Sequence, residues 1–240
     1  MRPIPRAASI AAMVLLAGSF SAPIGALETD DAQLDIVSRY LEASQTQHEV
    51  LKGLQMEVSI EARLPKLEKQ GRLQALRRIT RLGKIIYKPL GFSGDSAVKQ
   101  EVITRYLAAE VEQRDDVATA ITPDNYKFHL KATITDRGHR TYIFQLTPRK
   151  KRLGLFRGEL WLDAETGMPL RELGELVKSP SVFLKKVAFT YNNELRDGVA
   201  YPKKVEWKAE TRLVGRAELN IEFSNFTRQE EDDAEIAAGH

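Results

Sequence analysis

The chain has 240 residues, with 36 Lys and Arg, 33 Asp and Glu, and no cysteine. The lack of cysteine excludes a disulfide framework, a thiolate metal site and a lipid-modified cysteine. Without Arg2 and Arg6 of the N-terminal segment, 34 basic residues face 33 acidic ones, a net charge of +1, so the composition does not support nucleic-acid binding.

The N-terminal segment is typical of a secretory signal peptide. Arg2 and Arg6 form a short positive region, and residues 7–18 form an apolar run that is too short to span a bilayer of about 30 Å as a helix. Ala26 is the expected last residue before cleavage, with Ser21 as a second candidate, and an uncleaved anchor is the alternative interpretation. We therefore expect a signal peptide over residues 1–26, export to the periplasm, and one mature domain over residues 27–228.

The chain after this segment begins with a helix and then changes to strands. A helix is predicted over residues 28–47, because Thr29 suits its N-cap and apolar residues recur at helical spacing. Apolar and polar residues alternate over residues 54–64, which predicts a strand that ends at Pro65. Further strands are expected over residues 73–79 and 84–87.

A second helix is predicted over residues 97–114, opened by Gly94, Asp95 and Ser96. Apolar residues lie along one side of it, and charges of both signs occupy the rest. This pattern favours a helix packed on the core over a helix that lies on a membrane surface.

The remaining chain is predicted to be strands joined by tight turns. Val205, Trp207 and Ala209 alternate with charged residues, which gives a strand one apolar face and one polar face. The expected strands cover residues 117–122, 126–135, 142–147, 155–163, 170–176, 182–194, 203–214 and 216–226. Residues 229–240 are acidic and are expected to be a disordered tail. The predicted fold class is α+β, a large curved antiparallel sheet whose apolar face is covered by two main helices.

No set of residues predicts a catalytic, cofactor or metal site. Of the four histidines, His48 and His240 stand apart, and His129 and His139 flank a predicted hairpin without carboxylates at a ligand spacing. Because no nucleophile has a base partner in a recognisable motif, an enzyme is the least favoured class.

Aromatic residues share the apolar face of the predicted sheet. They form ordinary core if the helices cover that face completely, and they line a cavity if the helices cover it only in part. The expected ligand-lining residues are Phe128, Phe144, Leu160, Phe189, Tyr191, Trp207 and Phe223.

The sharpest charge feature is the run Arg149, Lys150, Lys151 and Arg152, which follows Pro148 on a predicted loop. One interpretation is a solvated loop, because charge runs at turns are common. The functional interpretation is contact with the phosphate head groups of anionic lipid or with an acidic partner surface.

The arrangement resembles the LolA-like periplasmic lipoprotein carriers and outer-membrane lipoprotein-sorting proteins. The likeness rests on residues 142–148, on the strand at 158–163 with the turn 166–169, and on the last strand to Phe226, and it covers roughly residues 34–226. The resemblance implies a half-open β-barrel with helices as a lid and an apolar cavity that takes acyl chains.

The same resemblance implies a non-enzymatic role in outer-membrane biogenesis. The partners it implies are a lipid or an acylated lipoprotein and a membrane-bound transporter or acceptor protein, with no cofactor and no nucleic acid. Two alternatives stay open, a periplasmic protein-interaction module with a filled core and an accessory of a lipid exporter.

Overall fold

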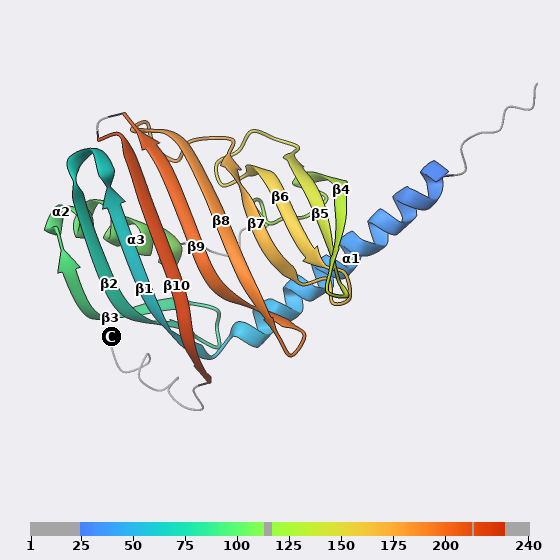
Figure 1. Ribbon diagram of the computed structural model, residues 1–240, viewed down its shortest axis with the longest axis horizontal. Coiled ribbons are helices and arrows are strands. Elements are labelled where there is room, and N and C mark those ends of the chain that lie inside the picture. The colour runs from blue at the N-terminus through green and yellow to red at the C-terminus, as the bar shows by residue number, and fades with distance from the viewer. Residues whose placement is uncertain (1–24, 113–116, 213, 229–240) are drawn as a thin grey trace, which may run out of the picture.

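The computed structural model describes residues 25–112, 117–212 and 214–228, so residues 1–24 of the predicted signal peptide and the predicted tail lie outside it. The described chain folds into one antiparallel sheet of ten strands with helices on one face (Figure 1). The strand order is β3-β2-β1-β10-β9-β8-β7-β6-β5-β4, which leaves β3 and β4 as the two edges. The predicted α+β class with a curved antiparallel sheet is therefore confirmed.

The strands are mostly 8 to 13 residues long and are joined by short connections, except between β3 and β4, where the second helical segment intervenes. They are β1 (Leu54–Leu64), β2 (Lys69–Ile79), β3 (Ile85–Gly94), β4 (Tyr126–Asp136), β5 (His139–Pro148), β6 (Phe156–Asp163), β7 (Pro169–Leu176), β8 (Leu184–Arg196), β9 (Val199–Thr211) and β10 (Arg216–Arg228).

The helices are α1 (Gly25–Leu51), the short 3-10 turn η1 (Pro65–Leu67), and a continuous segment made of α2 (Ser96–Val98), the π-helical turn η2 (Lys99–Thr104) and α3 (Arg105–Glu112). We call the segment 96–112 the lid helix. Its start is capped as the sequence predicts, because the Asp95 carboxylate accepts hydrogen bonds from the backbone N–H groups of Ala97 (2.8 Å) and Val98 (3.4 Å). In the described ranges, the helices lack the combination of length and apolar character that crossing a membrane requires.

The strand predicted over residues 117–122 is wrong, because this segment is a loop. The side-chain amide of Asn125 donates to the carbonyl oxygens of Val117 (2.8 Å) and Ala120 (2.9 Å). The backbone N–H groups of Asn125 and Tyr126 both donate to the carbonyl of Thr122. These local bonds satisfy backbone groups that a strand would have paired with a neighbour.

The strand predicted over residues 84–87 continues as β3 to Gly94, through Pro89 and Gly91. β3 is an edge strand, and its pairing with β2 shifts register between Gln74 and Ala75, opposite Pro89. A proline lacks the N–H that an inner strand needs, and an edge strand beside a bulge tolerates this loss.

Helix α1 crosses the sheet from β4 to β9 and is held there by three side chains. The amide of Gln33 donates to the carbonyl of Phe128 (3.2 Å) and accepts from the N–H of Leu130 (3.0 Å), beside the bulge of β4. Further along α1, Arg39 donates to the carbonyl of Ala164 and Gln47 to that of Ala200. The polar face of α1 thus fixes its position over several strands at once.

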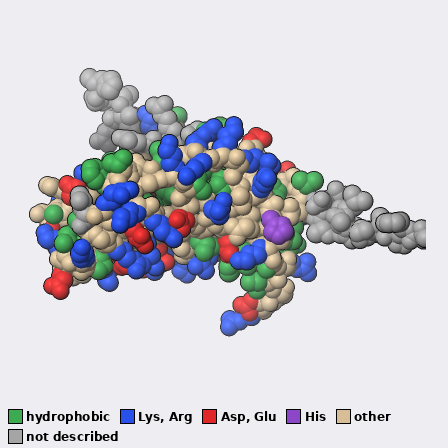
Figure 2. All heavy atoms as spheres, turned by 90° about the horizontal axis from the view of Figure 1, so that it is seen from above, with side chains coloured by type: hydrophobic (Ala, Val, Ile, Leu, Met, Phe, Trp, Pro, Cys, Tyr) green, Lys and Arg blue, Asp and Glu red, His purple; other side chains and the backbone are tan. Residues whose placement is uncertain are grey.

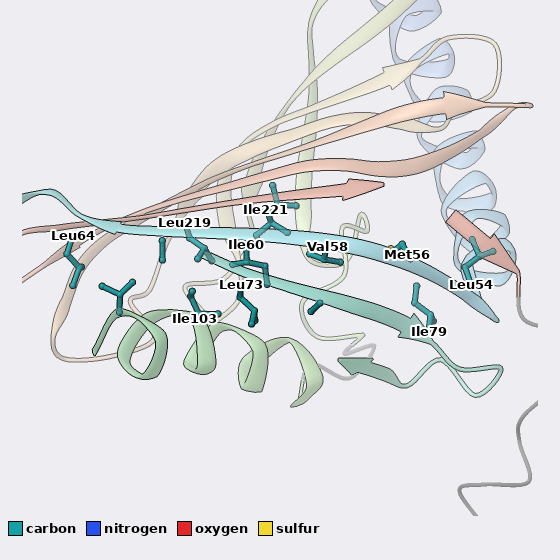
Figure 3. Close-up of a cluster of buried hydrophobic side chains, with 14 residues drawn as sticks. Leu54, Met56, Val58, Ile60, Leu64, Leu73, Ile79, Ile103, Leu219 and Ile221 are labelled. Atoms are coloured by element: carbon teal, nitrogen blue, oxygen red, sulfur yellow. The ribbon is translucent and has the colours of Figure 1, made fainter. Parts of the chain in front are cut away.

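The lid helix covers the other half of the same face. Figure 3 shows Ile103 of this helix beside side chains that β1, β2 and β10 direct toward it, among them Ile60, Leu73 and Leu219. These three residues are 0 to 5% exposed. Period-two alternation therefore produces a continuous apolar surface under the lid helix.

Gly174 of β7 lets two aromatic rings meet across its strand. Phe156 of β6 and Phe189 of β8 flank it, and their ring centroids lie 4.9 Å apart in an edge-to-face arrangement. A Cβ at Gly174 would lie 2.5 Å from a ring carbon of Phe156 and 2.6 Å from the carbonyl oxygen of Arg157. The packing around β7 therefore requires glycine at position 174.

We expect Gly174→Ala to lower the free energy of unfolding by about 1–3 kcal/mol or more, because the added methyl group overpacks a close-packed site. Gly91→Ala is the matched control, since a Cβ there meets nothing within 4 Å. Urea unfolding followed by circular dichroism measures both. Equal stability of the two variants would contradict the packing role of Gly174.

Candidate functional site

The helix-covered face of the sheet carries two hydrophobic clusters. The first lies under the lid helix and is built from β1, β2, β9 and β10, with Val98 and Ile103 of the lid helix. The second lies against α1 and is built from strands β4 to β8, with Ile36, Val37 and Tyr40 of α1. Each helix therefore has its own cluster.

Two aromatic residues connect these clusters. Tyr191 of β8 and Trp207 of β9 pack against both, and both stay partly accessible to solvent. Their rings meet edge to face with centroids 5.8 Å apart, and Trp207 also lies 5.1 Å from the ring of Phe189. We call Tyr191, Trp207 and the neighbouring Glu172 the aromatic seam.

The indole N–H of Trp207 is buried and interacts with the hydroxyl of Tyr191, but the contact does not meet the geometry of a full hydrogen bond. A buried donor that is incompletely satisfied is costly.

Glu172 of β7 is paired with Tyr191 across the strands and faces the same side of the sheet. The described residues offer its carboxyl group no hydrogen bond or ion pair. Burial raises the pKa of Glu172 from 4.5 to about 7. The same carboxyl group acts on its neighbours, because burial and then the charge of Glu172 raise the pKa of Tyr40.

The lid helix is tied to the sheet by a buried ion pair. Arg77 of β2 is 8% exposed and donates to one carboxylate oxygen of Glu110 through Nε (3.0 Å) and Nη2 (2.8 Å). The hydroxyl of Tyr87 on β3 donates to the other oxygen at 2.5 Å. Burial, followed by the charge of Glu110, raises the pKa of Tyr87. We call these three residues the lid latch.

The predicted lining residues all lie in the two clusters, but they are divided between them. Phe144 and Leu160 are fully buried against α1, with Phe189 almost so, and Phe128 packs on the same cluster. Phe223 belongs to the cluster under the lid helix. Only Tyr191 and Trp207 touch both. The seven residues therefore form two packed groups joined at the seam.

The described residues form an open hollow of about 480 Å³ at a different place. It is lined by Lys178, Ser179, Ser181, Val182, Leu184 and Arg212. None of the predicted lining residues contributes to it, so a cavity for an acyl chain over the apolar face stays a proposal.

The predicted basic run also lies apart from the seam. Arg149, Lys150, Lys151 and Arg152 are exposed on the loop between β5 and β6. Arg149 Nε donates to the carbonyl of Pro123 and Arg152 Nη1 to that of Ala118, so two of the four side chains brace the neighbouring loop.

Sequence reasoning missed Glu172 and the lid latch. The sequence does contain a signal for such residues. A charged residue that lies two positions from apolar residues on both sides of a strand shares their buried face, as Arg77 does between Ala75 and Ile79. Among the residues that the structure describes, no three His, Asp or Glu side chains gather as metal ligands.

Comparisons with known proteins find likeness to solved structures at low sequence identity. No protein-family model matches it, and no curated protein matches it. A LolA superfamily protein from Nitrosomonas europaea is 15% identical over 83% of this chain and 94% of that chain, with a TM-score of 0.36. An outer membrane lipoprotein-sorting protein domain from Vibrio parahaemolyticus is 12% identical over 81% and 94%, with a TM-score of 0.38.

A third solved structure is the MucA/MucB complex of Pseudomonas aeruginosa, 11% identical over 82% of this chain and 100% of that chain, with a TM-score of 0.29. The resemblance expected from the sequence is therefore confirmed as a distant one. At TM-scores below 0.5 these likenesses carry no functional weight, and the function proposed below rests on the residues of this chain.

We expect Glu172→Gln to remove a pH dependence of stability. The folded-state pKa of about 7 lies above the unfolded value of 4.5, so the folded chain binds more protons between them and its stability falls as pH rises through this window. Above pH 7 the variant should exceed the wild type by up to about 3 kcal/mol, and below pH 4.5 the two should agree.

Thermal unfolding across this pH range measures the effect. Glu175→Gln is the matched control on the same strand, because Glu175 is half exposed and pairs with Lys186 at 2.8 Å. A pH profile of Glu172→Gln that matches the wild type would contradict the burial of this carboxyl group.

Proposed function

We propose that the protein is a non-enzymatic binding protein of the periplasm that holds an acyl chain, of a lipid or an acylated lipoprotein, at the aromatic seam. The observation that supports this most directly is the seam itself. Two separately covered clusters meet there at aromatic side chains that water still reaches. The N-terminal segment typical of a signal peptide supports the location.

An acyl chain suits the seam because its methylene groups gain free energy on leaving water, about 0.8 kcal/mol for each buried group. Tyr191 and Trp207 offer aromatic faces to such a chain. The indole N–H of Trp207, whose contact with the Tyr191 hydroxyl is not a full hydrogen bond, offers a donor to the polar end of the guest. These groups bind and orient a guest, and none of them needs to react with it.

The guest acyl chain reaches the aromatic seam, in this proposal, when the lid helix is displaced. The lid helix is 17 residues long, contains a π-helical turn, and is fastened by the lid latch. Insertions of this kind in a helix often occur at functional sites. A guest that displaces the lid helix would take over the apolar contacts that the helix gives up, and a membrane-bound partner would then receive the guest.

A protein-interaction module with a filled core is the second candidate. It is favoured by the complete burial of Phe144 and Leu160, which pack against α1 and other strands without a guest. Under this alternative, the sheet edges or loops bind a protein and the seam stays closed.

Bromine-labelled stearate separates the two candidates, because bromine quenches tryptophan only at close range. The chain has two tryptophans, Trp207 in the seam and Trp161 at a β6 position that alternates with the buried Leu160 and Leu162. In Trp161→Phe the remaining emission comes from Trp207, and we expect saturable quenching. In Trp207→Phe the remaining emission comes from Trp161, and we expect little change.

Each alternative outcome has a clear meaning. Failure of brominated stearate to quench Trp207 at any soluble concentration would overturn the proposed function and favour the interaction module. Equal quenching of both tryptophans would show binding at the outer surface, and it would overturn the seam as the site.

We expect Glu110→Gln to speed the quenching of Trp207, because it removes the charge that holds the lid helix over the sheet. The same change leaves Arg77 buried without its counter-ion, and it should cost about 3 kcal/mol of stability. Stopped-flow fluorescence measures the rate, and urea unfolding measures the stability.

Glu101→Gln is the control on the same helix, since its ion pair with Arg105 is exposed and of little energetic value. If both variants take up brominated stearate at the wild-type rate, entry of the ligand does not require displacement of the lid helix.

A further inference from the structure

Three loops meet at one end of the sheet, where they form a basic and apolar edge. They are residues 117–125, residues 149–155 between β5 and β6, and residues 177–183 between β7 and β8. Backbone hydrogen bonds join them, from Arg149 to the carbonyl of Asn125 and from Val177 to the carbonyl of Leu155. We call this surface the loop edge.

The loop edge exposes large apolar side chains. Val117 is 82% exposed, Leu153 47%, Val182 77% and Phe183 58%. Single exposed apolar residues are common on protein surfaces, but four on three adjoining loops form a patch.

The backbone beneath these side chains is held in place. Arg212 donates from Nε to the carbonyl of Val182 at 2.8 Å, and its own N–H donates to the carbonyl of Phe183 at 2.9 Å. Arg152 donates from Nη1 to the carbonyl of Ala118 at 3.1 Å. The exposure of the apolar side chains is therefore a feature of an ordered surface.

The charge of the loop edge is positive. The described residues of the three loops contain five cations, namely Arg149, Lys150, Lys151, Arg152 and Lys178, and one carboxylate, Asp124. Lys150 and Lys151 form no ion pair with any described residue. Figure 2 shows the whole molecule from above, with many blue Lys and Arg side chains and fewer red Asp and Glu side chains among green hydrophobic ones.

The open hollow described above lies within this edge. Lys178 and Arg212 bring positive charge to it, Ser179 and Ser181 bring hydroxyl groups, and Val182 and Leu184 bring apolar surface. Cations and hydroxyls beside apolar surface suit a phosphate head group whose acyl chains start nearby.

We propose that the loop edge docks the protein onto a bilayer that contains anionic phospholipid. Cations near such a surface are attracted by its negative potential, and exposed Val and Phe side chains gain free energy by entering the boundary between head groups and acyl chains. This docking does not require a guest at the seam, so each proposal can fail without the other.

Vesicle flotation tests the docking, with vesicles of phosphatidylcholine alone and of phosphatidylcholine mixed with phosphatidylglycerol. The full chain is used, and because residues 1–24 are the same in every variant, differences between variants report on the loops. The wild type should float with the anionic vesicles at low salt and less so at high salt, where charges are screened.

Lys150→Gln with Lys151→Gln should weaken binding to the anionic vesicles on the order of thirtyfold, about fivefold for each charge. The matched control is Lys84→Gln with Lys88→Gln, two exposed lysines around the start of the edge strand β3. This control should bind like the wild type.

Val182→Ser with Phe183→Ser should remove the part of the binding that survives high salt. Both side chains are mostly exposed, so thermal unfolding should be unchanged. A wild type that floats with neither kind of vesicle, or loop variants that float in the same amount as the wild type, would overturn the proposal. So would an equal loss of binding in the Lys84 and Lys88 control.

Discussion

The structure depends on one constraint, which is that a ten-stranded antiparallel sheet has an apolar face too wide for a single helix. A helix with its side chains is about 10–12 Å across, whereas neighbouring strands lie about 4.8 Å apart. A helix that crosses the strands therefore covers only a narrow band of each one, and a helix that runs along the strands covers about two or three of them. The chain meets this constraint with two helices from distant parts of the sequence, and each covers its own cluster. The aromatic seam is where the two covers meet.

The two covers are fastened to the sheet by different kinds of contact. Side chains of α1 bond to backbone carbonyls of β4, of the turn after β6 and of β9, so its position is shared among many strands. The lid helix is fastened near both ends, by the lid latch at Glu110 and by its N-cap residue Asp95, which pairs with Lys69 of β2 at 3.1 Å. A buried ion pair contributes little net stability, because desolvation offsets the attraction, yet it specifies one position. The lid latch therefore specifies one closed position of the lid helix over the sheet.

Period-two alternation predicted most of the sheet, because side chains of a half-buried strand must alternate between core and water. Residues 54–64 form a strand as expected, and β8 and β9 are joined by a tight turn at Asp197 and Gly198, whose backbone has positive φ. The strand predicted at 117–122 failed, since the side chain of Asn125 offered that backbone a local alternative. The aromatic residues at alternate strand positions, on the apolar face of the predicted sheet, also proved to belong to the two clusters. Their division between two helices was not predictable, because it depends on which strands each helix crosses, and Glu172 became notable only once its surroundings were known.

The pairing of β1 with β10 has a consequence for how the chain assembles. The first strand lies between the second and the last, and Arg228 reaches back to the carbonyl of Val50 across 178 residues. A chain that emerges from its N-terminus first therefore holds one side of β1 unpaired until β10 has been made. Contacts at such sequence separation form slowly, because a long loop must close before any bond is made. The topology thus makes the pairing of β1 with β10 the last step in completing the sheet.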